Sequence, residues 1–385
     1  MVKKLEDKEK QKSRQLWEEI FTEDTKEFLD YYYREKLKDN QILGSFQEEM
    51  LVSMLHLNPY RLCVGKLEIV SDYIVAVATK EEYRHQGRMA ELLHEAMDEA
   101  RKKGRPFVFL MPAKEAIYKP FDFVTVYGRK DYCFTKEWLS KATQREASFN
   151  GNSIYIEEIT ETVAEKAFKM AITELCKYSQ RKLQEQYQVF AKRDEQYYSR
   201  LIKEQRSQQG SILLARDSFS GKICGYCFMT KEGTVQLREL VCDEHREIEI
   251  LNAIWEKYGI DKALKLFGGE FSDNGLPVDH VFPCIMIRVT DICKFMELIP
   301  LQPEEIQWLE SHPVIEVQDS FLEENQGQYF VTVEKQGKEF FAKARKQCDF
   351  LQKAGERQKA IPVFNVEEIV KKSFKKLKIF LNEVV

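Results

Sequence analysis

A short turn between an apolar run and an amphipathic segment carries the residues best suited to chemistry. The apolar run from Tyr73 to Thr79 predicts a strand, and the spacing of apolar residues from Met89 to about Lys103 predicts a helix. The turn between them reads Arg84-His-Gln-Gly87-Arg-Met. The first N–H groups of a helix lack intrahelical partners, and the helix dipole favours negative charge there. We therefore expect a phosphate-like anion to bind this turn, and the alternative is a solvated turn without a ligand.

A second candidate lies after the next apolar run, Pro106 to Met111. The chain continues as Ala113-Lys-Glu-Ala-Ile-Tyr118-Lys-Pro-Phe121-Asp-Phe123. A tyrosine hydroxyl, with an unperturbed pKa of about 10, can donate a proton to a leaving group. The alternative is that Tyr118 is an ordinary half-buried aromatic residue, one of 17 tyrosines.

These two motifs together resemble the GNAT acetyltransferases. The R-x-x-G-x-x spacing after a hydrophobic strand is similar to their pyrophosphate loop, whose ligand is acetyl-CoA. Ile117-Tyr118-x-x-Phe121-x-Phe123 is similar to their Tyr-bearing helix and Phe-Gly-Phe-like element, with Asp122 where Gly is usual. The chain most resembles the enhanced intracellular survival protein family of bacterial N-acetyltransferases. Ile285-Met-Ile-Arg288-Val, an apolar last strand and the chain length are also typical of that branch.

The resemblance implies an α+β architecture: tandem GNAT folds, with mostly antiparallel mixed sheets flanked by helices, followed by a sterol-carrier-like α/β domain. The expected domains are a catalytic domain at 1–145, a second GNAT-like domain at 146–283, and a third domain at 284–385 that ends in the active site. The second unit repeats the element order of the first, but its helix from Glu244 to Trp255 starts without Gly and carries three Glu. Carboxylates at that end would repel a pyrophosphate, so we expect no cofactor there.

The resemblance also assigns residues to roles. The α-carboxylate of Val385 would serve as the base, although an aromatic last residue is common in the family, and Tyr118 would be the acid for the leaving sulfur. The residues expected to contact acetyl-CoA are Val77, Ala78 and Thr79 at the acetyl-pantetheine arm, His85, Gln86, Gly87, Arg88, Met89 and Ala90 around the pyrophosphate, and Ala113 and Lys114 after the second strand.

The expected function is acetyl-CoA-dependent transfer of acetyl to a primary amine on an aminoglycoside, a polyamine or a lysine side chain. The alternative is a non-catalytic acyl-CoA or lipid-binding protein, which the sterol-carrier-like unit and the Asp122 departure favour. A scaffold is a third hypothesis. The family forms homo-oligomers, so self-association does not separate these functions.

The composition argues against a nucleic-acid partner and against a membrane-spanning segment. The net charge of −4, with 32% charged residues, gives no basic balance for nucleic acid. The N-terminus is charged from the start, and no apolar stretch approaches the ~18 residues of a membrane span. We therefore expect a soluble, cytoplasmic protein of two or three domains.

Three local predictions complete the sequence analysis. A turn at Asn58-Pro59 should separate two strands, Ser45 to Leu55 and Arg61 to Ile69. A long helical region from Thr162 to Gln208 is interrupted near Lys192-Arg-Asp194. Cys224 and Cys227 should point to opposite faces of one strand, so no metal site is expected among the nine cysteines.

Overall fold

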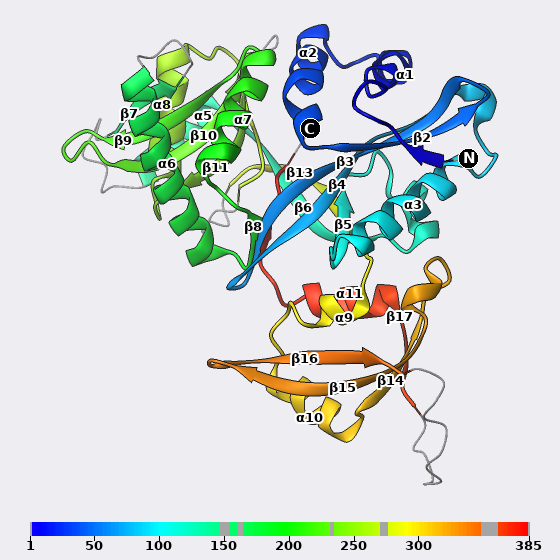
Figure 1. The fold of residues 1–385 in the computed structure, drawn as a ribbon. Helices are drawn as coiled ribbons and strands as arrows, with labels where there is room; N and C mark the ends of the chain where they lie inside the picture. Colours follow the sequence, from blue (N-terminus) through cyan, green and yellow to red (C-terminus); the bar gives the residue numbers. More distant parts are fainter. Residues whose placement is uncertain are drawn as a thin grey trace.

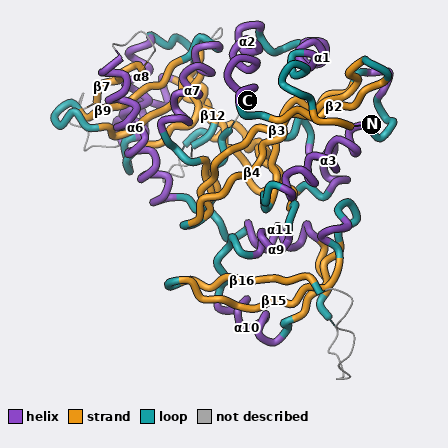
Figure 2. The backbone as a smooth tube through the Cα atoms, in the orientation of Figure 1, coloured by secondary structure: helices purple, strands orange, loops and turns teal. Residues whose placement is uncertain are grey.

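A single mixed sheet of 14 strands crosses the upper part of the molecule, and a four-stranded sheet lies below it (Figure 1). The computed structural model describes residues 2–145, 154–159, 165–231, 235–269, 276–347 and 361–383. The large sheet has the order β1-β2-β3-β4-β5-β13-β6-β12-β11-β10-β9-β7, and β8 and β18 pair at its side. Figure 2 shows helices on both faces of this sheet.

The first unit (residues 2–145) contains the long β3–β4 hairpin. Alternate side chains of β3 point to opposite faces of the sheet. Leu55 and Leu57 pack with α3 on one face, and Met54 packs with α1 and α2 on the other. The elements are β1 Val2–Lys4, α1 Lys12–Ile20, α2 Lys26–Glu35, β2 Gln41–Gln47, β3 Met50–Val64, β4 Leu67–Thr79, α3 Arg88–Lys102, β5 Phe107–Leu110, α4 Glu115–Tyr118, β6 Val124–Thr135 and α5 Lys136–Arg145.

Strand β3 passes through Asn58 and Pro59 without a break, so the predicted turn there is wrong. Pro59 pairs with Asp72 of β4. On the other edge of β3, pairing with β2 ends at Leu57 and pairing with β8 starts at Leu62. A proline fits in this interval because it lacks an N–H to donate to a ladder.

The second unit (residues 154–269), like the first, is a sheet with helices packed on both faces. Its α6 and α7 cover one face of the sheet, and its α8 covers the other together with α5 of the first unit. The predicted interruption of the long helical region is confirmed, and the short strand β8 lies there. The elements are β7 Ile154–Ile159, α6 Glu165–Gln186, β8 Val189–Ala191, α7 Glu195–Ser207, β9 Ser211–Asp217, β10 Ile223–Thr230, β11 Gln236–Cys242, α8 Glu247–Tyr258 and β12 Ala263–Phe267.

The third unit (residues 276–383) is tied into the sheet of the first. Strand β13 lies between β5 and β6 and is antiparallel to both, so the expected boundary at 283/284 falls inside this strand. The last described strand, β18, pairs with β8. The elements are β13 Val278–Val289, α9 Ile292–Met296, α10 Pro303–Ser311, β14 Val314–Gln318, β15 Gly327–Gln336, β16 Glu339–Lys346, β17 Val363–Asn365, α11 Val366–Phe374 and β18 Ile379–Phe380.

The prediction that Cys224 and Cys227 point to opposite faces is wrong. A bulge in β10 shifts the register between Ile223 and Gly225, and both thiols pack into the same cluster as Met229. A bulge of this kind changes the side-chain alternation by one residue. Burial raises the pKa of both thiols, which favours their protonated form. Within the described ranges, no three His, Cys, Asp or Glu side chains gather as metal ligands.

None of the helices in the described part of the chain is long and apolar enough to cross a membrane.

Candidate functional site

The first part of the candidate site is an opening between β4 and β5. These parallel strands pair only from Asp72 to Ile74 on β4, and beyond that point β4 continues without β5. Here β4 bulges: Ala76 has a φ of 50°, and the register against β3 slips so that Ala76 and Val77 together face Leu55. A bulge leaves a residue out of the ladder. Main-chain groups of Val77 to Thr79 can therefore bind a ligand in the opening.

The predicted anion turn lies at the end of this strand. His85 and Gly87 both have positive φ, 60° and 78°, and Gly87 caps the N-terminus of α3. Glu91 N–H donates to the Gly87 carbonyl, so the helical ladder starts there. The N–H groups of Arg88, Met89 and Ala90 lie before that point and have no intrahelical acceptor.

The arginine side chains of the turn brace it. Arg84 Nε donates to the Thr79 carbonyl at 3.2 Å. Arg88 Nη1 donates to Ser45 Oγ at 2.9 Å, and the guanidinium lies over the Tyr83 ring. Both charges stay near the turn while main-chain N–H groups remain to hold an anion, which is the geometry of helix-start phosphate sites.

We expect Gly87→Ala to weaken CoA binding about tenfold. A Cβ at Gly87 meets nothing within 4 Å, so the effect comes from the φ of 78°, which costs an L-residue about 1–2 kcal/mol. The free variant relaxes out of this conformation, and CoA binding must restore it. Calorimetric titration with CoA measures this. Gly65→Ala is the matched control, because Gly65 also has a positive φ and open space but lies in the β3–β4 turn. Equal CoA affinity in both variants would contradict the assignment of the turn.

Tyr118 ends α4, in the same apolar cluster as Val77 and Met89. Its side chain is 8% exposed, and its ring meets Phe123 edge-on at 5.7 Å. Burial raises the pKa of Tyr118 to about 12. No described residue hydrogen-bonds to its hydroxyl. A buried, protonated phenol beside the β4 opening is suited to donate a proton.

Asp122 adopts the conformation for which glycine is favoured. Its φ is 57°, in the left-handed region, which Asp tolerates better than most residues. Its carboxylate lies 3.7 Å from the buried guanidinium of Arg288, which donates to the Phe121 carbonyl and also pairs with Asp319. Arg288, from the Ile285-Met-Ile-Arg288-Val motif, thereby connects the third unit to the segment that follows Tyr118.

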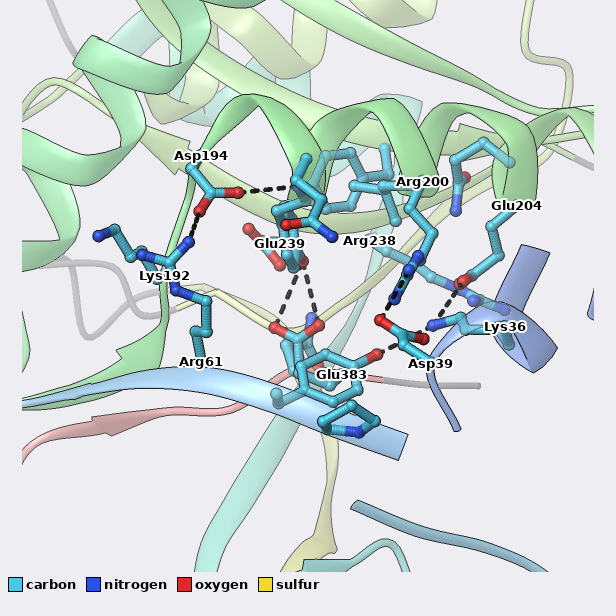
Figure 3. A pocket seen from close by; sticks show the side chains of 18 of the residues that line it. Lys36, Asp39, Arg61, Lys192, Asp194, Arg200, Glu204, Arg238, Glu239 and Glu383 are labelled. Carbon is cyan, nitrogen blue, oxygen red and sulfur yellow. Dashed lines mark hydrogen bonds and ion pairs between the residues drawn. The ribbon is translucent and has the colours of Figure 1, made fainter. Parts of the chain in front are cut away.

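The second part of the site is a cavity of about 270 Å³ between the three units. Figure 3 shows α7 on one side of the cavity, β3 on the other, and Glu383 of the C-terminal segment between them. The cavity opens beside Pro59, Tyr60 and Arg61, where β3 has neither β2 nor β8 as a neighbour. The side chains that face the cavity are those of Asp194, which caps the N-terminus of α7, and of Tyr197, Arg200, Leu201 and Glu204 on the helix, at spacings of three and four.

A buried ion cluster fastens the C-terminal segment to this cavity. The Arg193 side chain is 0% exposed, and its guanidinium lies 3.1 Å from Glu239 and 3.2 Å from Glu383. Tyr73 donates from its hydroxyl to the Glu383 carbonyl at 3.0 Å, and Tyr197 donates to the Glu383 carboxylate at 3.1 Å. These contacts hold residue 383 over the central strands of the first unit.

Glu239 occupies a special position in the repeat. It has a φ of 55° at a bulge of β11, and His245 after that strand has a φ of 61°. Ala76 and His85 have the same features in the first unit. The second unit therefore keeps the bulged strand, but α8 has Glu247 and Glu249 in its first turn. At the bulge of β11, the second unit has the carboxylate of Glu239, which contacts Arg193.

Burial raises the pKa of Glu239 above its usual value of 4.5. Because the folded state then holds the proton more tightly than the unfolded state, the favourable contribution is full below pH 4.5 and is lost as pH rises through the folded pKa. In wild type, this loss lowers the unfolding free energy by up to about 1.4 kcal/mol for each pH unit above pH 5. We expect Glu239→Gln, which has no proton to lose, to lack this part of the decline. Urea unfolding from pH 5 to 8 measures this. The same pH slope in wild type and variant would contradict it.

The predicted site residues thus lie in one region, with one exception. Val77 to Thr79 are the last residues of β4, and His85 to Ala90 follow that strand. Ala113 and Lys114 follow the carboxyl end of β5, and Tyr118 ends the short helix after them. Val385 lies outside the described residues. Sequence reasoning missed the cavity residues Lys36, Arg200, Glu204, Glu239 and Glu383, and the buried Arg193 that pairs with the last two. The charged stripe of α7 was a usable signal for two of them.

Comparison with known proteins agrees with this geometry. Residues 1–126 match the family model of the acetyltransferase (GNAT) domain. No curated protein matches the sequence.

Solved structures share the fold across nearly the whole chain. A conserved protein of unknown function from Enterococcus faecalis aligns with a TM-score of 0.70 and 17% identity over 90% of this chain and 85% of that one. A GCN5-related N-acetyltransferase from Anabaena variabilis gives 0.66 and 16%, over 90% and 86%. Eis1 from Mycobacterium abscessus gives 0.59 and 12%, over 97% and 89%. At these identities the likeness concerns the fold.

Proposed function

We propose that this N-acetyltransferase, whose residues 1–126 match the GNAT acetyltransferase domain, transfers acetyl from acetyl-CoA to a primary amine held in the cavity between the three units. The observation that supports this most is the bulged β4, which separates from β5 and leads into the anion turn at His85 to Gly87. Acetyl-CoA supplies a pyrophosphate for this turn and a thioester carbonyl for the bulge.

The chain's own groups match the steps of acetyl transfer. Main-chain N–H groups at Val77 to Thr79 stabilise the carbonyl oxygen as negative charge develops. The amine nitrogen forms its bond to the acetyl carbon while the carbon–sulfur bond breaks. Tyr118 gives its proton to the leaving sulfur, and the α-carboxylate of Val385 takes the proton of the amine.

The position of Glu383 supports the role of the tail. Tyr73 of β4 fixes the Glu383 carbonyl at 3.0 Å, four residues before Val77 on the same strand. Two further residues reach at most about 7 Å from there. This short reach supports the proposed role of the Val385 carboxylate, and the Arg193 cluster limits where the tail can start.

Each of the three units has a different proposed role. The first unit would bind acetyl-CoA, and the second would bind none, because Glu247 and Glu249 occupy the start of α8. The third unit, proposed to be sterol-carrier-like and of the enhanced intracellular survival type, would deliver the C-terminus. We further propose a cytoplasmic homo-oligomer.

Mass spectrometry of acceptors tests the function. The full-length protein is incubated with acetyl-CoA and aminoglycosides, polyamines or lysine peptides, and CoA binding is measured separately by calorimetry. A product heavier by one acetyl group supports the proposal. CoA binding with no acetylated product from any amine would favour the alternative, a non-catalytic acyl-CoA or lipid-binding protein.

A further inference from the structure

We infer that the amine acceptor also carries a negatively charged group, such as a carboxylate, and that Arg200 receives it in the cavity. This inference rests on the proposed function and narrows its substrate class. It favours an amino acid or peptide-like amine over a polycation.

The cavity lining is balanced in charge. Its carboxylates are Asp39, Asp194, Glu204, Glu239 and Glu383, and its cations are Lys36, Arg61, Lys192, Arg200 and Arg238. Five of each sign cancel, so the lining offers no net attraction to a molecule that carries only positive charges. A polyamine or aminoglycoside would bring ammonium groups close to those five cations, and like charges brought together cost energy.

Most interior carboxylates are already paired. Glu239 and Glu383 share Arg193, and Glu204 accepts from Tyr31 at 3.0 Å and lies 3.5 Å from Lys36. An incoming polycation would compete with these buried partners at each contact. A molecule with one amine and one carboxylate adds no net charge to the cavity.

Arg200 has unused capacity for an anion. Its Nη2 lies 2.9 Å from Asp39, which is its one hydrogen-bond partner within the described part of the chain. Arg200 lines the cavity, and Figure 3 shows its side chain extending from α7 toward Asp39. A guanidinium has five donors in a planar fork that fits a carboxylate with two parallel bonds.

The dimensions suit a small acceptor. Arg200 and Glu204 are one helical turn apart, about 6 Å along α7. A volume of about 270 Å³ lies just below the usual range of ligand pockets, about 300–1,000 Å³, which fits a molecule the size of an amino acid better than a compound of several rings.

Matched acceptor pairs test this. Free lysine and cadaverine differ only by the α-carboxylate, as do ornithine and putrescine. We expect kcat/KM to be at least about tenfold higher for the carboxylate-bearing member, because a hydrogen bond between two charged groups is stronger than one between neutral groups. Arg200→Gln should remove this preference, mainly through KM for lysine. Lys203→Gln is the control, because Lys203 lies on the same helix, pairs with Glu35 and does not line the cavity.

The outcomes are distinguishable. Acetylation of cadaverine and putrescine in preference to lysine and ornithine overturns the inference and leaves the proposed function standing. A preference for lysine that survives in Arg200→Gln overturns the assignment of the anion site to Arg200. Failure to acetylate any amine, with acetyl-CoA bound and unchanged, overturns the proposed function and the inference with it.

Discussion

Tyr118→Phe is expected to lower kcat at least about 100-fold and to leave the affinity for acetyl-CoA unchanged, because general acid catalysis contributes about 10²–10⁴-fold. The variant keeps the ring that packs against Phe123 in the cluster with Val77 and Met89. Only the hydroxyl is lost, and no described residue hydrogen-bonds to it, so folding should not suffer. Steady-state kinetics combined with calorimetric titration of acetyl-CoA measures both quantities.

The pH dependence provides a second readout for Tyr118. Since burial raises its pKa to about 12, the phenol stays protonated from pH 6 to 9 and should cause no alkaline loss of kcat in that range. Tyr258→Phe is the control: it removes a hydroxyl that bonds Glu158 in the second unit, away from β4. Wild-type kcat in Tyr118→Phe would contradict the acid role.

Arg193→Met is expected to destabilise the protein by about 3–5 kcal/mol, because removing one member of a buried ion cluster leaves the others unpaired. Glu239 and Glu383 would both lose their guanidinium, which is 0% exposed. Urea unfolding measures the loss. Activity should fall as well, because residue 383 loses one of the contacts that hold the C-terminal segment.

Two comparisons make this prediction specific. The double variant Arg193→Met with Glu239→Gln should regain part of the stability, because one unpaired carboxylate is neutralised. Arg61→Met removes a half-exposed arginine that pairs with Asp194 and Glu68, and exposed pairs contribute about 1 kcal/mol or less. If Arg193→Met is no less stable than Arg61→Met, the buried cluster does not hold the segment.

Local features of the fold were predictable from the sequence. The strand, turn and helix around Gly87 were predicted because each depends on neighbouring residues: an apolar run, a glycine with positive φ, and a periodic helix. The Asp122 departure is explained by a φ of 57°, which glycine adopts freely and Asp adopts at modest cost.

Long-range features were not predictable in this way. Asn58-Pro59 is typical of a turn, yet β3 continues there because the missing neighbour on one edge accommodates proline. The β10 bulge that puts Cys224 and Cys227 on one face leaves no mark in the alternation of residues.

The cavity also could not be predicted from the sequence. Lys36, Arg200 and Glu383 come from three units and meet only because β3 lacks a neighbour beside them. No spacing in the sequence relates residues so far apart. The insertion of β13 between β5 and β6 is likewise a property of the assembled sheet.

The most direct test of acetyl transfer at this site is free-thiol release from acetyl-CoA, measured side by side for wild type, Tyr118→Phe and a chain that ends at Val384. Deleting Val385 moves the C-terminal carboxylate back by about 3.5 Å. The account predicts amine-dependent release in wild type and loss of that release in both variants, with CoA binding retained in all three. Undiminished release in both variants would contradict it.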